Sequence, residues 1–296
     1  MQRDSSSKTA FVLGGGGHLG AAEVGMLHAL LRRGVRPDLV VGTSVGALHG
    51  AVVAAEPTPA SVVRLEEAWG RLSRLGVLGS SWFTDATILL RTRTHVRSNE
   101  PLRRLVRELV GVETFEELAV PFHCVAASIE RTAEHWFSSG PLVEAILASS
   151  AVPGILPPVE VGGEHFMDGG LVNSVPLDRA VALGAEEIFV LHVGRLDQPL
   201  SAPRRLRDVA MVAFEVARRH RFVRELENAP AHVTIHVLPT GDPSPPAYND
   251  LTQLRYRSVS GFDRRIAWAA AATDAYLAQL EAVGGATDEA SGPLAG

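Results

Sequence analysis

Four consecutive glycines, in the segment GGGGHLG at residues 14–20, constrain this 296-residue chain more than any other feature. Glycine tolerates positive φ and lets other groups approach the main chain, at a cost of about 0.5–1 kcal/mol per site in a regular element. A short apolar run precedes the glycines at 10–13, and apolar residues at helical spacing follow them at 21–31. We therefore expect a strand, a glycine loop and a helix, with free N–H groups and the helix dipole directed at one point.

Such a loop is suited to an anion, either a bound phosphate or the transient oxyanion of an acyl-transfer reaction. The spacing Gly15-x-Gly17-x-x-Gly20 fits the dinucleotide-binding fingerprint. That fold also needs an acidic residue at the end of the next strand, about 20 residues further on. Here the next strand ends in Val-Gly-Thr at 41–43, and Asp38 lies at its beginning. The missing acid argues against a nucleotide.

The segment GTSVG at 42–46 favours the second interpretation, in which the glycine loop binds the oxyanion of an acyl-transfer reaction. A G-x-S-x-G motif between a strand and a helix is typical of a nucleophile elbow, a sharp turn that presents a serine at the edge of a sheet. Gly42 and Gly46 remove the Cβ atoms that would clash in such a turn. Ser44 is therefore a candidate nucleophile, and the alternative is that it only caps a helix.

A base for this serine is available in HFMDGG at 165–170. A short predicted strand ends in Asp168, and Gly169 and Gly170 turn the chain so that the carboxylate can project at the sheet edge. An Asp-Gly pair alone usually marks a turn. Its value here comes from its combination with the glycine loop and with Ser44.

Alternating strands and helices predict a single α/β domain with a mostly parallel, doubly wound sheet. Further strands are expected at 122–129, 187–193 and 232–238. The predicted organisation is a disordered segment at 1–9, one domain at 10–283 with a possible lid at 76–99 and a C-terminal helix at about 262–280, and a disordered tail at 284–296. The possible lid contains Trp82 and Phe83.

Composition excludes several classes of protein. With 46% hydrophobic residues, 21% charged residues and a net charge of −5, the chain has the balance of a globular protein and no basic field for nucleic acid. A single cysteine, Cys124, rules out an intrachain disulfide and favours a cytoplasmic setting. The start of the chain does not resemble a signal peptide, and no apolar stretch approaches the roughly 18 residues of a membrane span. Contact with a membrane is therefore expected to be peripheral.

The order and spacing of GGGGHLG, GTSVG and DGG resemble those of the patatin-like phospholipase family. The similarity extends to VLGGGGHLGAAEVGMLHALLRRGV and to ASSAVPGILPPVEVGGEHFMDGGLVNSVP, and it covers roughly residues 10–240. It implies a patatin-like (PNPLA-type) fold, a mostly parallel sheet flanked by helices that is related to but distinct from the α/β-hydrolase fold.

The resemblance also implies an activity and its residues. A member of this family is a lipid acyl hydrolase, of phospholipase A or lysophospholipase type, that uses a Ser-Asp dyad. We expect no organic cofactor and no metal, because the sequence shows no ligand loop for an ion such as Ca²⁺. Ser44 would be the nucleophile and Asp168 the general base. The main-chain N–H groups around Gly15, Gly16, Gly17 and His18 would form the oxyanion hole. The supporting glycines would be Gly20, Gly42, Gly46, Gly169 and Gly170.

One position departs from the family pattern. The family usually has arginine or lysine directly before the last glycine of the loop, where this chain has Leu19. The loop therefore lacks a cation that could support it or contact an anionic head group. The substrate would be a lipid or another acyl ester, with head group, chain length and oligomeric state left open.

Two other functions remain open. An ordinary α/β-hydrolase would use a Ser-Asp-His triad, and four histidines follow Asp168 in the required order: His192, His220, His232 and His236. Ser44 leaves room for only two strands before the elbow, whereas that fold normally builds several first. The other alternative is a catalytically weak or inactive member that binds lipid or regulates a partner.

An arginine-rich stretch at 203–226 is predicted to be a helix. One interpretation of such a basic helix is contact with a membrane. Its apolar residues fall on one stripe, however, and such a stripe more often packs against the core while the charged face meets solvent. We therefore expect the arginines to be solvated and the following residues to be buried: Val209, Val212, Ala213 and Val216.

Overall fold

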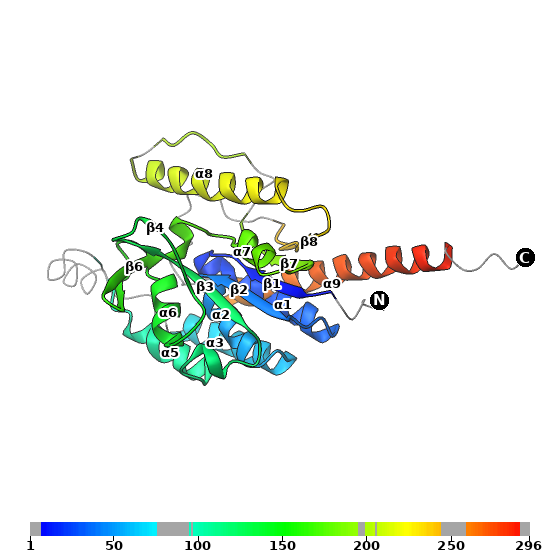
Figure 1. Cartoon of the computed structure of the whole chain (residues 1–296), viewed down its shortest axis with the longest axis horizontal. Helices are drawn as coiled ribbons and strands as arrows, with labels where there is room; N and C mark the ends of the chain where they lie inside the picture. Colours follow the sequence, from blue (N-terminus) through cyan, green and yellow to red (C-terminus); the bar gives the residue numbers. More distant parts are fainter. Residues whose placement is uncertain are drawn as a thin grey trace, which may run out of the picture.

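The computed structural model describes residues 7–75, 95, 97–194, 199–204, 206–243 and 259–290. A mixed sheet of eight strands forms its centre, in the order β5-β6-β3-β2-β1-β7-β8, with β4 also paired to β3 (Figure 1). The strands are β1 Thr9–Leu13, β2 Leu39–Thr43, β3 Phe122–Ser128, β4 Ala133–Phe137, β5 Val159–Val161, β6 Glu164–Asp168, β7 Glu187–Leu191 and β8 Thr234–Val237.

Five successive strands, β3, β2, β1, β7 and β8, are parallel to one another. β4 and β6 pair with β3 in the antiparallel direction, and β5 pairs with β6 in the same way. The α-helices are α1 Ala21–Arg32, α2 Val45–Ala55, α3 Pro59–Leu75, α5 Glu100–Val110, α6 Leu142–Ser149, α7 Leu177–Ala182, α8 Leu206–Glu227 and α9 Val259–Ala290. Short 3₁₀ helices are η1 Gly17–Gly20, η2 Phe115–Glu117 and η3 Gly169–Leu171.

Helices cover both faces of the sheet, as the period-two alternation of a strand requires. On β1, Phe11 and Leu13 belong to a large core that includes residues of α1, α2, α3, α5, α6 and α9. Ala10 and Val12 belong to a second core that includes residues of α7 and α8. Figure 1 shows α7 and α8 on one side of the sheet and α1, α2 and α3 on the other. The predicted α/β fold with a mostly parallel, helix-flanked sheet is confirmed.

The ends of the chain differ from the expectation. The first nine residues are not all outside the fold, because β1 begins at Thr9. Helix α9 continues to Ala290, so residues 284–290, expected as part of a disordered tail, are helical. Trp82 and Phe83, with most of the possible lid at 76–99, lie outside the described residues. Among the helices of the described segments, none combines the length and the apolar character needed to cross a bilayer.

Helix α8 is turned the opposite way from the prediction. Val209 and Val216 are 48% and 53% exposed, whereas the side chain of Arg218 is only 9% exposed. Phe222 on the same helix is buried. Arg218 and Arg221 face the domain because backbone carbonyls and carboxylates there accept their hydrogen bonds. Sequence periodicity identified the two stripes of this helix but could not show which of them faces inward.

Candidate active site

Strand β3 brings Ser44 and Asp168 together. Strand β2 is parallel to β3 and ends at Thr43, which lies opposite Val125. Strand β6 is antiparallel to β3 and ends at Asp168, opposite the next residue, Ala126. Because β4 occupies the other edge of β3, β2 and β6 share one edge and meet end to end. Ser44, the first residue after β2, therefore falls beside Asp168.

Ser44 lies in a sharp turn between β2 and α2. Its φ of +55° and ψ of −122° place it in a region that L-residues rarely adopt. Hydrogen bonds support the turn on both sides: Ser44 N–H donates to Ser149 Oγ at 2.9 Å, and Ser150 Oγ donates to Ser44 O at 3.2 Å. A Cβ at Gly46 would lie 2.5 Å from the carbonyl oxygen of Leu13, so only glycine lets the turn approach β1.

The hydroxyl of Ser44 donates directly to the carboxylate of Asp168, with 2.7 Å between Oγ and Oδ2. The other oxygen, Oδ1, accepts from Gly170 N–H at 2.7 Å. Burial raises the pKa of Asp168 from an ordinary 3.8 to about 6, against the smaller opposing effect of these two hydrogen bonds. A Cβ at Gly169 would lie 2.2 Å from Val125 O, so this glycine lets the aspartate lie tight against β3.

The glycine loop passes directly beside Ser44. A Cβ at Gly15 would lie 3.5 Å from Ser44 Cβ, so a side chain there would crowd the serine. Gly15 N–H donates to Ser174 O at 2.8 Å and is therefore occupied within the fold, contrary to its expected role as an oxyanion donor. Gly16 and Gly17 follow at the start of η1, with Gly17 at φ +55°. His18 is buried and packs edge-on against Phe262 of α9.

A chain of buried hydrogen bonds lies beside the loop and was not predicted from the sequence. Trp69 Nε1 donates to His49 Nε2 at 3.1 Å, so the neutral imidazole carries its proton on Nδ1 and donates it to Glu23 Oε2 at 2.7 Å. Burial lowers the pKa of His49 to about 3 and raises that of Glu23. A Cβ at Gly20 would lie 3.2 Å from His49 Cε1. His49 is 26 residues from Glu23 and 20 residues from Trp69. No sequence motif links residues at these spacings.

The contact between Ser44 and Asp168 is direct, without a histidine between them. His192 is buried next to the loop, where a Cβ at Gly14 would lie 3.5 Å from its Nδ1. Burial, with Arg218 and Arg219 nearby, holds the pKa of His192 well below its usual range. His236 instead contacts Tyr276 on α9, with 3.0 Å between Nδ1 and Oη. This geometry does not support the Ser-Asp-His triad.

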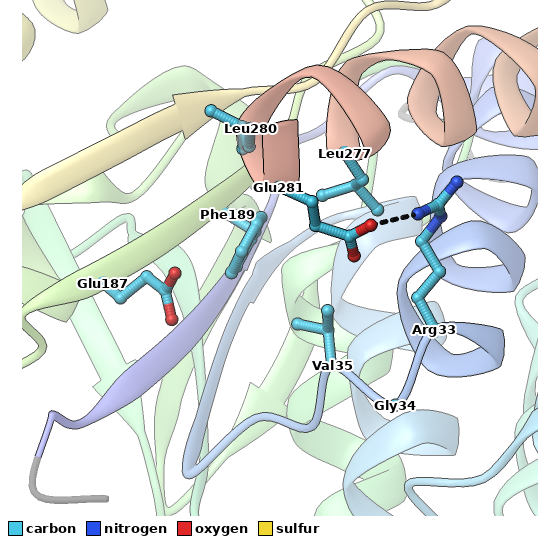
Figure 2. Close-up of a pocket in the computed structure, with 8 residues that line it drawn as sticks. All are labelled: Arg33, Gly34, Val35, Glu187, Phe189, Leu277, Leu280 and Glu281. Carbon is cyan, nitrogen blue, oxygen red and sulfur yellow. Dashed lines mark hydrogen bonds and ion pairs between the residues drawn. The ribbon is translucent and has the colours of Figure 1, made fainter. Parts of the chain in front are cut away.

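A separate pocket of about 270 Å³ lies between the end of α1, β7 and α9 (Figure 2). Phe189 and Leu277 line it, and two further lining residues, Arg33 and Glu281, form an ion pair at 3.1 Å. Glu187, the first residue of β7, also lines it. Ser44 follows the carboxyl end of β2, and β2, β1 and β7 run in the same direction. The pocket lies near the amino ends of β2 and β7, because Val35 precedes β2 and Glu187 begins β7. The pocket and Ser44 are therefore at opposite ends of the parallel strands. The pocket is not part of the Ser44 site.

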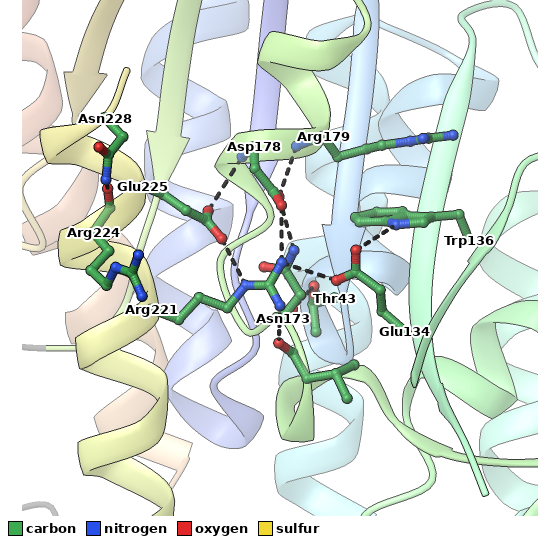
Figure 3. Close-up of polar contacts among 11 residues, drawn as sticks. Thr43, Glu134, Trp136, Asn173, Asp178, Arg179, Arg221, Arg224, Glu225 and Asn228 are labelled. Carbon is green, nitrogen blue, oxygen red and sulfur yellow. Dashed lines mark hydrogen bonds and ion pairs between the residues drawn. The ribbon is translucent and has the colours of Figure 1, made fainter. Parts of the chain in front are cut away.

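Helix α8 is attached to the segment that follows Asp168. The guanidinium of Arg221 donates to Val172 O at 2.7 Å and to Glu225 at 2.7 Å on its own helix (Figure 3). It also reaches Glu134 on β4 and Asp178 on α7, each at 2.9 Å. One arginine thus joins α8 to three elements around the site.

Comparisons with known proteins agree with this geometry. The family model described as patatin-like phospholipase matches residues 11–181. Lysophospholipase nte1 of Aspergillus fumigatus is 32% identical over 187 residues, covering 63% of this chain and 12% of that protein. Neuropathy target esterase sws of Drosophila melanogaster is 29% identical over 195 residues, covering 65% and 13%. Patatin-like phospholipase domain-containing protein 7 of Rattus norvegicus is 29% identical over 198 residues, covering 64% and 14%. The chain thus spans about an eighth of the length of these relatives.

Solved structures give weaker similarities. VipD from Legionella pneumophila has a TM-score of 0.41 at 14% identity, covering 90% of this chain and 67% of that one. ExoU, in its complex with SpcU from Pseudomonas aeruginosa, has a TM-score of 0.40 at 18% identity, covering 88% and 52%. The family model, by contrast, covers more than half of the chain and includes both Ser44 and Asp168, and the chain belongs to the patatin-like phospholipase family.

Proposed function

We propose that the chain is a serine-dependent acyl hydrolase that cleaves the carboxylic esters of phospholipids or lysophospholipids. The observation that supports this most directly is the 2.7 Å hydrogen bond from Ser44 Oγ to a buried carboxylate, at a turn held in a strained conformation. A serine hydroxyl is a weak nucleophile unless a base accepts its proton as it attacks. Asp168 is placed to do so.

In the proposed reaction Ser44 Oγ attacks the ester carbonyl carbon while its proton passes to Asp168 Oδ2. The carbonyl oxygen becomes an oxyanion, which we assign to the N–H groups of Gly16, Gly17 and His18, since Gly15 N–H is occupied. The tetrahedral intermediate expels the alcohol part of the ester, which takes the proton from Asp168. Water then attacks the acyl-serine with Asp168 again accepting a proton. When the second tetrahedral intermediate collapses, Ser44 Oγ takes that proton back from Asp168 and a free fatty acid leaves.

We also propose that the substrate is met at a lipid surface, through peripheral contact. Leu171, three residues after Asp168, is 41% exposed. Val209, Val216 and Val223 are exposed on the outward side of α8, whose inward side contacts the segment that follows Asp168. Exposed apolar side chains beside a catalytic site and on a neighbouring helix suit contact with aggregated lipid.

The direct test of this function is product analysis with purified protein in EDTA. We expect free fatty acid from lysophospholipid and phospholipid, with one ¹⁸O atom in the acid when the reaction is run in H₂¹⁸O, and a faster reaction on micelles than on monomers. Release of phosphate or of a phosphorylated head group would mean that the protein cleaves a phosphate ester bond and not the carboxylic ester. No release from any acyl ester, with the protein folded, would support the lipid-binding alternative.

The pH dependence of ester hydrolysis should follow the ionisation of the Asp168 carboxyl. The carboxylate must be ionised to accept the proton of Ser44, and burial raises its pKa to about 6. Activity should therefore be present above this pKa and be lost as the pH falls, with kcat/KM decreasing about tenfold per pH unit below the midpoint. We expect a midpoint near 6 with an uncharged ester as the substrate. A midpoint near 4 would mean that the reacting carboxyl is solvated.

A further inference from the structure

One face of α8 is directed at the catalytic loops. Phe214, Arg218 and Arg221 are spaced four and three residues apart and therefore share a side of the helix. The tip of Phe214 lies 3.4 Å from where a Cβ at Gly170 would be, and Arg221 binds Val172 O. Arg218 lies between these two contacts and extends to the glycine loop.

The contact of Arg218 is with the backbone of that loop. Its Nη1 donates to the carbonyl oxygen of Gly15 at 3.3 Å. Its Nη2 pairs with Glu215 Oε1 at 2.6 Å, and the two side chains are only 9% and 13% exposed. The guanidinium is thus held by its own helix in a largely desolvated position, where a hydrogen bond to a backbone carbonyl is stronger than in water. Arg218 has no part in the proposed proton transfer.

The orientation of the Gly15–Gly16 peptide follows from this contact. No described peptide bond is cis, so the carbonyl of Gly15 and the N–H of Gly16 point in opposite directions. A peptide between two glycines can rotate at little steric cost, because neither residue has a Cβ. The hydrogen bond from Arg218 selects the rotation in which Gly15 O faces α8 and Gly16 N–H faces away from it.

We propose that Arg218 is a positioning residue that fixes Gly16 N–H as an oxyanion donor. This inference rests on the proposed function. Gly15 lies against Ser44, so the direction of the next N–H decides whether a donor faces the reacting carbonyl. The guanidinium also places a positive charge on this side of the loop. Leu19 packs against the large core, and α8 supplies the cation that the loop itself lacks.

Arg219 offers a matched control because it is adjacent and shares the same carboxylate, with 3.1 Å between its Nε and Glu215 Oε2. We would compare Arg218→Met with Arg219→Met by kcat, KM and thermal unfolding on a lysophospholipid. We expect Arg218→Met to lower kcat about 10- to 100-fold with little change in KM, since a misdirected donor weakens only the transition state. Arg219→Met should stay within about threefold of wild type.

Two further readouts separate positioning from a general loss of structure. The acid midpoint of kcat/KM should stay near that of wild type in Arg218→Met, because the proton acceptor is unchanged. Arg218→Lys keeps one donor and should recover part of the lost kcat. If Arg218→Met does not fold, the comparison of Arg218→Lys with Arg219→Lys replaces it, with a lower kcat expected only for the former.

Equal kcat values for the Arg218 and Arg219 variants would overturn the inference, and so would a loss of kcat that matches a loss of folded protein. Either result with an active wild type leaves the hydrolase function standing. An inactive wild type would instead count against the proposed function itself, so the two failures are distinguishable.

Discussion

Replacing Ser44 by alanine is expected to lower ester hydrolysis by at least about 1000-fold. The substitution removes Oγ, the atom that forms the acyl-enzyme in the proposed reaction. The backbone of the turn keeps its hydrogen bonds to Ser149 and Ser150, because these use the main chain of residue 44. Thermal unfolding of the Ser44→Ala protein should therefore remain cooperative.

The control for this variant is Ser61→Ala. Ser61 is also a buried serine, in the first turn of α3, and its hydroxyl donates to Thr58 O at 2.8 Å. It should keep the wild-type rate. Hydrolysis by Ser44→Ala within tenfold of wild type would mean that another residue carries the reaction.

The second large effect is expected from Asp168→Asn. An asparagine oxygen can still accept from Gly170 N–H, but the amide then presents a donor to Ser44 Oγ and cannot take its proton. We expect kcat to fall about 100- to 10,000-fold, the range for loss of a general base. Alanine substitutions of the nearby His192 and of His236 should have far smaller effects. A near-normal rate for Asp168→Asn would exclude the dyad.

The same variant should be at least as stable as wild type. The folded pKa of Asp168, about 6, lies above its ordinary 3.8. The stabilising contribution of the protonated carboxyl is therefore present below pH 4 and is lost as the pH rises through 6. At pH 7 the buried charge costs on the order of 3 kcal/mol, which a neutral amide avoids. A gain in unfolding free energy together with lost activity is typical of a residue kept for catalysis.

The sequence predicted the parts of the site that depend on local turns. Glycine spacing predicted the loop at 14–20 and the turn at Ser44, because both need backbone approaches that a side chain would block. The sequence also predicted that a strand would end in Asp168, at the edge of the sheet where Ser44 lies. The structure adds the reason for their contact, which is the register of β2 and β6 on β3.

Long-range contacts of single side chains could not be predicted. Arg218 lies 203 residues from Gly15, and no local pattern links the two. The buried chain of Glu23, His49 and Trp69 likewise joins three helices through isolated polar residues. The orientation of α8 was predicted wrongly because the helix has apolar residues on two sides. Its inward side combines the buried Phe222 with arginines that bind backbone carbonyls and carboxylates of neighbouring elements.

The central claim is that the fold activates Ser44 toward an acyl carbonyl. The most direct measurement is the intact mass of the protein after reaction with a fluorophosphonate, followed by mapping of the modified peptide, for wild type and Ser44→Ala. The account predicts one adduct on wild type, located at Ser44, and none on the variant. No adduct on folded wild type in the presence of liposomes, or an equal adduct on both proteins, would contradict it.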